Sequence, residues 1–142
     1  GAYQSVRNAD ARQAWQNVGE RIPHLIRPVL AVSDRETLQA ALDRWDRARQ
    51  VSLVTVDDHG RMLAALAIAA ADAVPIERRA EVLIGPFTSI IPAEQRVVLG
   101  DDPMDLVRAL SDSGLWAVFV TDDRMRSLGV LLSTDVNAAL GS

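Results

Sequence analysis

The sequence contains no cysteine, and all fifteen of its basic residues are arginine. Without cysteine the chain forms no disulfide and offers no thiolate as a nucleophile or metal ligand. The two histidines, His24 and His59, are far apart and in no metal-ligand spacing. The motifs H-E-x-x-H, G-x-S-x-G, G-x-x-x-x-G-K-S/T and G-x-G-x-x-G do not occur. Together these absences predict a chain that is not a self-contained enzyme.

An excess of basic charge and long apolar runs are also missing. The net charge is −4, which argues against a nucleic-acid-binding surface because such a surface needs clustered basic residues. The apolar run Met62–Ala71 has ten residues and is too short to cross a bilayer. With 49% hydrophobic and 24% charged residues, the composition is that of a globular domain. The short apolar run predicts a soluble piece, and the start Gly1-Ala2-Tyr3, without an initiator methionine, predicts a fragment of a longer protein.

The first segment predicts an amphipathic helix from Ala2 to about Gly19, within a connector of residues 1–25. Apolar residues on one face recur at three- and four-residue steps: Ala11, Trp15, Val18 and Ile22. Gly19 and Pro23 predict its end. Two interpretations stay open: a helix packed on its own domain, or a connector to a domain further upstream.

The rest of the chain predicts one order of elements twice: strand, helix, two strands joined by a turn, and helix. The first copy comprises strand Val29–Val32, a helix opened by the S-x-x-E capping box Ser33–Glu36, strands Val51–Val56 and Met62–Leu66 around the turn Asp57–Gly60, and helix Ala67–Val74. The second comprises strand Val97–Leu99, a helix capped by Asp101 or Asp102, strands Trp116–Val120 and Ser127–Leu131 around the turn Thr121–Met125, and a helix from Ser133 or Thr134 to Leu140.

Individual residues of the two copies correspond. In the first helices, Leu38, Ala41 and Leu42 match Leu106, Ala109 and Leu110, 68 residues further on. In the hairpins, Asp57, Asp58, Leu63 and Leu66 match Asp122, Asp123, Leu128 and Leu131, 65 residues further on. A single unit of about 60 residues buries too little surface to be stable alone. We therefore expect the copies to pack on each other, with the N-terminal helix outside both.

The second copy closes with Leu128–Val136, in which an aspartate follows the glycine of the last strand by six residues. This ending and the duplicated β-α-β-β-α unit resemble the cystathionine-β-synthase (CBS) repeat over about residues 26–140. The resemblance implies an α/β (α+β) fold in which two CBS repeats, residues 26–80 and 81–142, pack as an intramolecular pair with pseudo-twofold symmetry.

Residues Gly129, Ser133, Thr134 and Asp135 form the predicted ligand site. A helix N-terminus suits a phosphate, a carboxylate suits a ribose diol, and a glycine admits a flat base. The resemblance implies an adenine nucleotide, AMP or ATP, although Leu132 stands where the family usually has Thr or Ser. The first repeat has neither glycine nor aspartate in its matching stretch, Ala64–Ala70. In the alternative interpretation, Asp135 is only a favourable charge at a helix terminus.

The linker Val74–Arg79, the degenerate first repeat and the ending Gly129–Val136 resemble the C-terminal CBS pair of actinobacterial site-2 proteases, which are intramembrane zinc metalloproteases. The resemblance implies attachment to such a protease on the cytoplasmic face of the cell membrane. The zinc belongs to that parent, and this fragment supplies no ligand for it.

Three function classes follow. The leading one is a regulatory module that senses an adenine nucleotide. The second is an interaction module with degenerate ligand sites that forms a homodimer, with Trp45 or Trp116 in the contact. The third, a stand-alone enzyme, lacks any nucleophile–base or metal constellation. The Asp57-Asp58 and Asp122-Asp123 pairs invite a metal site, but aspartate is favoured in hairpin turns for its backbone hydrogen bonds.

Overall fold

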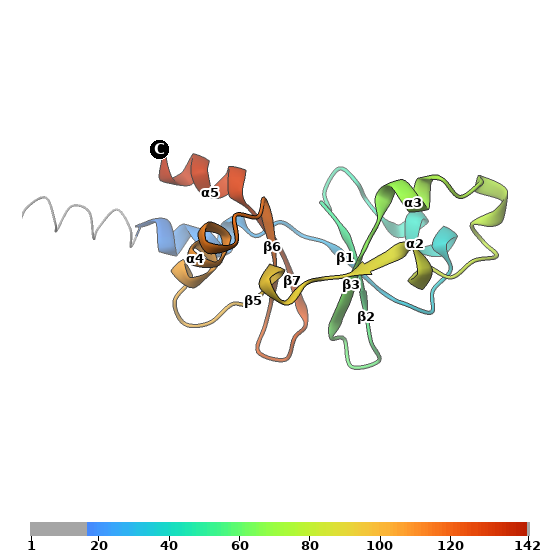
Figure 1. Cartoon of the computed structure of the whole chain (residues 1–142), viewed down its shortest axis with the longest axis horizontal. Helices are drawn as coiled ribbons and strands as arrows, with labels where there is room; N and C mark the ends of the chain where they lie inside the picture. Colours follow the sequence, from blue (N-terminus) through green and yellow to red (C-terminus); the bar gives the residue numbers. More distant parts are fainter. Residues whose placement is uncertain (1–16, 142) are drawn as a thin grey trace, which may run out of the picture.

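Two small sheets, each with helices on its outer side, make up the fold (Figure 1). The computed structural model describes residues 17–141. The strand orders are β1-β2-β3-β4 and β5-β6-β7. The strands are β1 (Leu30–Ser33), β2 (Leu53–Val56), β3 (Met62–Leu66), β4 (Thr88–Ile90), β5 (Arg96–Val98), β6 (Ala117–Thr121) and β7 (Ser127–Leu132). The labelled α-helices are α2 (Leu38–Arg44), α3 (Ile68–Asp72), α4 (Met104–Ser113) and α5 (Ser133–Leu140), and short 3-10 helices are η1 (Ile76–Arg78), η2 (Gly85–Phe87) and η3 (Ala93–Gln95).

The predicted duplication is present. In the first unit, α2 joins the parallel strands β1 and β2, and β2 pairs antiparallel with β3. In the second, α4 joins the parallel strands β5 and β6, and β6 pairs antiparallel with β7. Each unit closes with a helix, α3 or α5. The predicted α+β class and the order β-α-β-β-α are therefore confirmed.

The central strands β2 and β6 hold the two units together. Successive side chains of a strand point to opposite faces, so each central strand serves two cores. Leu53 packs under the helices of the first unit, whereas Val54 packs between the sheets. In the second unit Val118 lies under the helices and Phe119 lies between the sheets. Burial on both faces explains why these strands are apolar except for the buried Thr55 and Thr121. The shared core confirms that the two sheets face each other.

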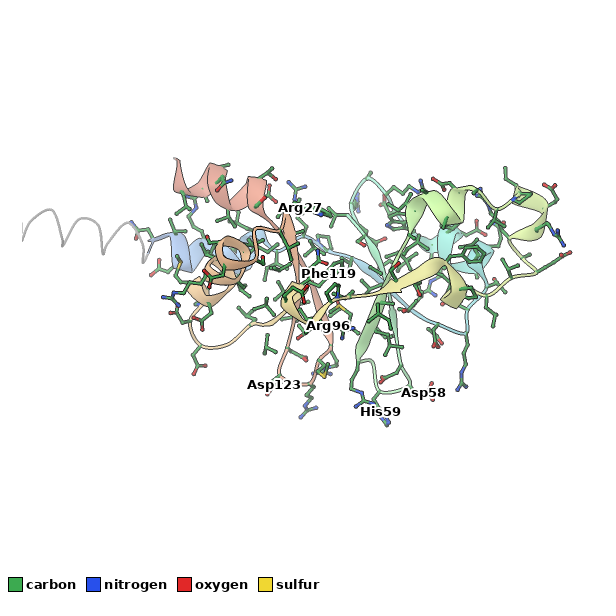
Figure 2. The ribbon with its side chains drawn as sticks, in the orientation of Figure 1. Arg27, Asp58, His59, Arg96, Phe119 and Asp123 are labelled. Carbon is green, nitrogen blue, oxygen red and sulfur yellow. The ribbon has the colours of Figure 1, made fainter. Side chains whose placement is uncertain are left out.

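The two hairpin turns have the same hydrogen-bond pattern. The Asp57 carboxylate accepts the backbone N–H groups of His59 and Arg61, and the Arg61 Nε at 2.7 Å. Asp122 repeats this arrangement with Arg126 Nε at 2.9 Å. The hairpins lie side by side, with their tips on the same side of the molecule (Figure 2). The predicted backbone-bonding role of the aspartates is confirmed, and no three potential metal ligands come together within residues 17–141.

The predicted end of the N-terminal helix at Gly19 is wrong. Residues 17–25 are helical, through both Gly19 and Pro23. Val18 and Ile22 are buried in the core of the second unit, and this burial outweighs the local preference of glycine and proline to end a helix. The expectation that the helix lies outside both repeats is wrong for the same reason. Its predicted part before residue 17 lies outside the described residues.

The predicted capping box at Ser33–Glu36 is also wrong. Ser33 ends β1, and its hydroxyl accepts the backbone N–H of Arg35 in a turn. Helix α2 begins four residues later than expected because Thr37 is its N-cap, accepting the N–H of Ala40 at 3.1 Å. Serine and threonine make such local bonds equally well, so the sequence offered two starts. In the second unit α4 begins at Met104 with Pro103 as its N-cap, so the predicted cap at Asp101 or Asp102 is placed too early. Asp102 still accepts the backbone N–H of Met104 at 3.0 Å.

The two described tryptophans have different environments. Trp45 is buried in the core of the first unit, and its indole N–H donates to the Gln50 carbonyl at 3.0 Å. Trp116 is 69% exposed, and its place in a homodimer contact stays a prediction. A role for Trp116 in binding stays open.

Each unit is completed by the segment that precedes the first strand of the other unit. Residues 17–25 pack in the second core, and Arg27 then bridges to Val130 of β7 before the chain enters β1. Conversely, Ile84 packs in the first core and β4 pairs with β3 before the chain enters β5. In space, the first lobe therefore includes Ile84 and β4, which follow the predicted boundary at residue 80, and the second lobe includes residues 17–25. Strand β4 was not predicted.

Candidate ligand-binding site

Gly129, in β7, lies directly beneath the segment that leads into β1. Its φ is +139°, and a Cβ at this position would be 2.2 Å from the Arg27 carbonyl oxygen and 2.7 Å from Cγ2 of Ile26. Arg27 and Val130 exchange two backbone hydrogen bonds of 2.8 and 2.9 Å. The space above this glycine, which was expected to admit a base, is thus filled by the chain's own backbone.

Asp135, in the first turn of α5, forms a bidentate ion pair with Arg27. Its Oδ2 accepts Arg27 Nε at 2.6 Å and its Oδ1 accepts Nη2 at 2.9 Å. The hydrogen bonds from Arg27 hold the pKa of the Asp135 carboxyl below its usual value. An ionised carboxylate has about four acceptor sites, and the Asp135 side chain is 20% exposed. Arg27 therefore neutralises Asp135 and leaves some of its acceptor sites open.

We expect replacement of Arg27 by alanine to raise the pKa of Asp135 toward its usual value, because the replacement removes both hydrogen bonds and the adjacent positive charge. In the wild type the depressed pKa contributes stability above the pKa of the unfolded chain, and this contribution disappears as the pH falls through the folded pKa. Carbon-13 NMR titration of the carboxyl groups measures the pKa, and urea unfolding at several pH values measures the stability. An Asp135 pKa equal in the two proteins would contradict the ion pair.

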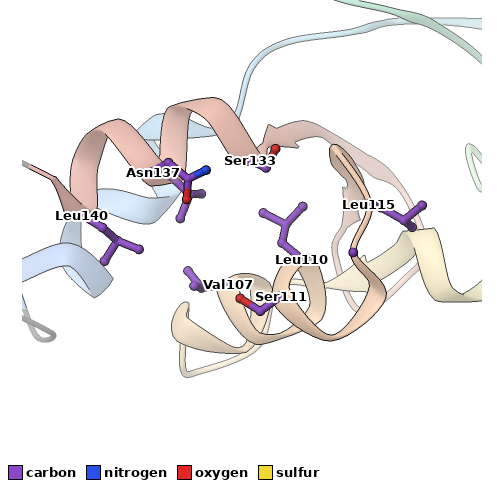
Figure 3. Close-up of a pocket in the computed structure, with 9 residues that line it drawn as sticks. Val107, Leu110, Ser111, Leu115, Ser133, Asn137 and Leu140 are labelled. Atoms are coloured by element: carbon purple, nitrogen blue, oxygen red, sulfur yellow. The ribbon is translucent and has the colours of Figure 1, made fainter.

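Ser133 and Thr134 do not join the Arg27–Asp135 pair in one cavity. The N–H of Ser133 donates to the Trp116 carbonyl at 2.8 Å, and Thr134 is exposed. Ser133 lines a groove of about 250 Å³ between α4 and α5 (Figure 3), which Leu110 and Asn137 also line. The structure thus brings Gly129 and Asp135 together through Arg27 and places Ser133 on a separate groove.

A second cavity, of about 380 Å³, lies between the two repeats. The first repeat contributes Val51, Ser52, Ala65, Leu66 and Ile68, and the rest of the lining is Gln95, Trp116, Phe119, Val130 and Leu132. None of the described residues that line it is charged. Its size and its mixture of aromatic, aliphatic and few polar groups are those of small-molecule sites. None of the four predicted site residues lines it.

The sequence contained one signal for this cavity. Val51 and Trp116 are equivalent positions of the duplication, each one or two residues before a central strand. An apolar residue at both positions, outside the strand that it precedes, indicates a shared surface where the repeats meet. Sequence reasoning missed it because the motif at Gly129 and Asp135 was the more specific pattern.

The fold is that of a tandem pair of CBS domains. No protein-family model matches the sequence, and a search of curated proteins finds no match. Among solved structures, a CBS domain-containing protein of unknown function from Kribbella flavida superposes with a TM-score of 0.66 at 15% identity, covering 85% of this chain and 97% of that one. The CBS domains of a transcriptional regulator from Streptococcus pneumoniae superpose with a TM-score of 0.60 at 16% identity, covering 82% and 96%. The chain is also similar to CBSX2 in complex with AMP, with a TM-score of 0.58 at 18% identity, covering 84% and 96%.

These similarities define the architecture, and they confirm the predicted fold of a CBS pair. Within residues 17–141, each helix is too short or too polar to cross a membrane.

Proposed function

We propose that this chain is a regulatory module that binds an adenine-containing ligand between its two repeats and thereby controls an attached protein. The cavity between the repeats carries the proposal. Because both repeats line it, a ligand there would favour one relative position of the two sheets over others, which is how binding becomes regulation. The AMP complex of the structurally similar CBSX2 supports adenine as the ligand class.

The residues present fit the base and the ribose better than the phosphate. The cavity offers Trp116 and Phe119 as apolar surfaces for a base. Asp135 does not line the cavity but follows the lining residue Leu132 by three positions. In this proposal the ribose diol lies at the edge of the cavity, on the open acceptor sites of this carboxylate. Arg27, the cation that contacts this carboxylate, is already paired with it.

The attached protein in this proposal is a site-2 type intramembrane zinc metalloprotease, with the module on the cytoplasmic face of the cell membrane. The linker resemblance at Val74–Arg79 supports this origin. The full-length coding sequence tests it directly, because a zinc metalloprotease of this kind should carry H-E-x-x-H in an upstream membrane-spanning segment. Upstream sequence without membrane segments would exclude this parent and leave the ligand proposal intact.

Calorimetric titration with AMP, ADP, ATP and S-adenosylmethionine tests the ligand. Replacing Asp135 with alanine removes charge-assisted hydrogen bonds to the ribose, and we expect affinity to fall about ten- to a hundredfold. Replacing Ala70, the matching position of the first repeat, with serine should leave affinity unchanged. Equal affinities of wild type and Asp135→Ala would show that Asp135 is only a charge at a helix terminus.

A second candidate function is an interaction module that holds two copies of its parent together. The filled space above Gly129 and the exposed apolar side chains of Trp116 and Ile90, 69% and 81% exposed, favour it. We expect the isolated chain to be a homodimer at tens of micromolar, a concentration that reveals weak association. Light scattering measures this, and a monomer throughout that range would exclude the second candidate.

A further inference from the structure

We propose that the cavity between the repeats selects an uncharged planar ring, such as a nucleobase or nucleoside, and gains nothing from a phosphate. This inference rests on the proposed function, because it names the chemical class that the same cavity takes. It is carried by the charge of the lining: aromatic and aliphatic side chains with one amide and one hydroxyl, and no basic residue among those described.

The aromatic groups provide the ring-binding surface. Trp116 stands at the mouth with most of its side chain in solvent, and Phe119, buried, extends from β6 toward the other sheet. Figure 2 places Phe119 between the two lobes. A ring that covers exposed indole removes apolar surface from water and stacks on it, which contributes about 1–3 kcal/mol per base in single-stranded nucleic acid complexes. Every base has such a face, so stacking alone requires no charge.

The polar groups of the lining suit the edge of a heterocycle. The Gln95 amide donates through Nε2 to the Ala117 carbonyl at 3.2 Å, which orients its Oε1 as an acceptor. The Ser52 hydroxyl, one residue before β2, can donate and accept. A neutral ring with N–H and ring-nitrogen groups on its edge satisfies both, whereas a purely apolar ligand leaves them without partners.

The surrounding charges disfavour an anion. The chain carries a net charge of −4, and Arg27, which stands before β1, is neutralised by Asp135. The half-buried Arg96 directs its guanidinium to three backbone carbonyls of the first repeat and its connecting segment. A phosphate attached to the ring would thus lose part of its hydration, and the lining offers no cation to compensate.

The test compares adenine, adenosine, AMP, ATP and indole by quenching of tryptophan fluorescence and by calorimetry. We expect adenosine to bind at least as tightly as AMP, adenine to bind more weakly than adenosine because it lacks the ribose, ATP to bind more weakly than AMP, and the affinity for adenosine to be insensitive to salt. Trp116→Ala should weaken adenosine binding about ten- to a hundredfold, whereas Ile76→Ala, which also truncates an exposed apolar residue but lies outside the cavity, should not.

A charge-introducing variant keeps the inference falsifiable in the folded protein. Ile68 lines the cavity and is 44% exposed, so Ile68→Arg places a cation at its rim, and AMP should then bind more tightly than adenosine. Tenfold tighter binding of AMP or ATP than of adenosine by the wild type would overturn this inference and leave the proposed function standing. Binding of indole alone would support the inference and overturn the adenine-sensing function. Absence of binding by all five compounds would overturn both.

Discussion

Replacement of Gly129 by alanine is expected to destabilise the fold more than any other single added methyl group at a described glycine. The new Cβ would lie 2.2 Å from the Arg27 carbonyl oxygen, and the φ of +139° is one that residues other than glycine rarely adopt. Backbone strain of this kind and overpacking each cost about 1–3 kcal/mol. We therefore expect the free energy of unfolding to fall by about 3 kcal/mol and the Tm by roughly 10 °C.

Gly100 provides the matched control. A Cβ added there meets nothing within 4 Å, so Gly100→Ala should change stability by no more than about 0.5 kcal/mol. Urea and thermal unfolding of the two variants measure the difference. Because residues 26–27 also carry the partner of Asp135, Gly129→Ala should in addition raise the pKa of Asp135. Equal stability of the two alanine variants would mean that the segment does not lie on β7.

Replacement of Arg96 by alanine has the second largest expected effect. Its Nε donates to the Ile91 carbonyl at 3.0 Å, its Nη1 to the Met62 carbonyl at 2.7 Å, and its Nη2 to the Leu63 carbonyl. Arg96 opens β5 of the second sheet, whereas Met62 and Leu63 belong to β3 of the first. One half-buried side chain thus joins the two sheets directly (Figure 2).

The variant leaves three carbonyls without this donor. Hydrogen bonds to charged groups contribute about 1.5–3 kcal/mol, and an unsatisfied buried acceptor adds its desolvation penalty. We expect Arg96→Ala to lose about 3 kcal/mol of unfolding free energy in urea titration. Arg96→Lys should recover only part, because an ammonium is a point charge and cannot place donors on three separate carbonyls as a planar guanidinium does. Arg35→Ala, at an exposed arginine, serves as control, and an equal loss there would refute the bridging role.

The strands and hairpins were predictable because their signals are local. Leu53–Val56 and Ala117–Val120 are short and mostly apolar, and an aspartate that starts a turn follows each within two residues. In the structure both aspartates bond to the backbone of their own turn. Because the chain is duplicated, each strand pattern occurs twice, and each copy supports the prediction made for the other. The start of α2 was ambiguous, because Ser33 and Thr37 are both suitable N-cap residues.

The candidate site depends on contacts between residues far apart in the sequence, which no local sequence pattern indicates. Gly129 and Asp135 were recognised from their spacing, but the residue that contacts both, Arg27, is 108 positions away from Asp135. No periodicity in residues 17–27 indicates that they cross to the second sheet. Strand β4 was missed for a similar reason, because its three residues acquire their extended form by pairing with β3.

The packing of residues 17–25 in the second core also determines which lobe a pulling force at this end would reach first. The first lobe is built from one continuous stretch, from β1 to β4, whereas the core of the second joins Val18 and Ile22 to Leu106 and Val136. Tension applied at residue 17 is therefore carried across the second lobe, from the helix of residues 17–25 into α4 and α5, before it reaches the neighbouring strand β1. Of the two lobes, the one more distant along the chain would be the first to sense tension applied at residue 17.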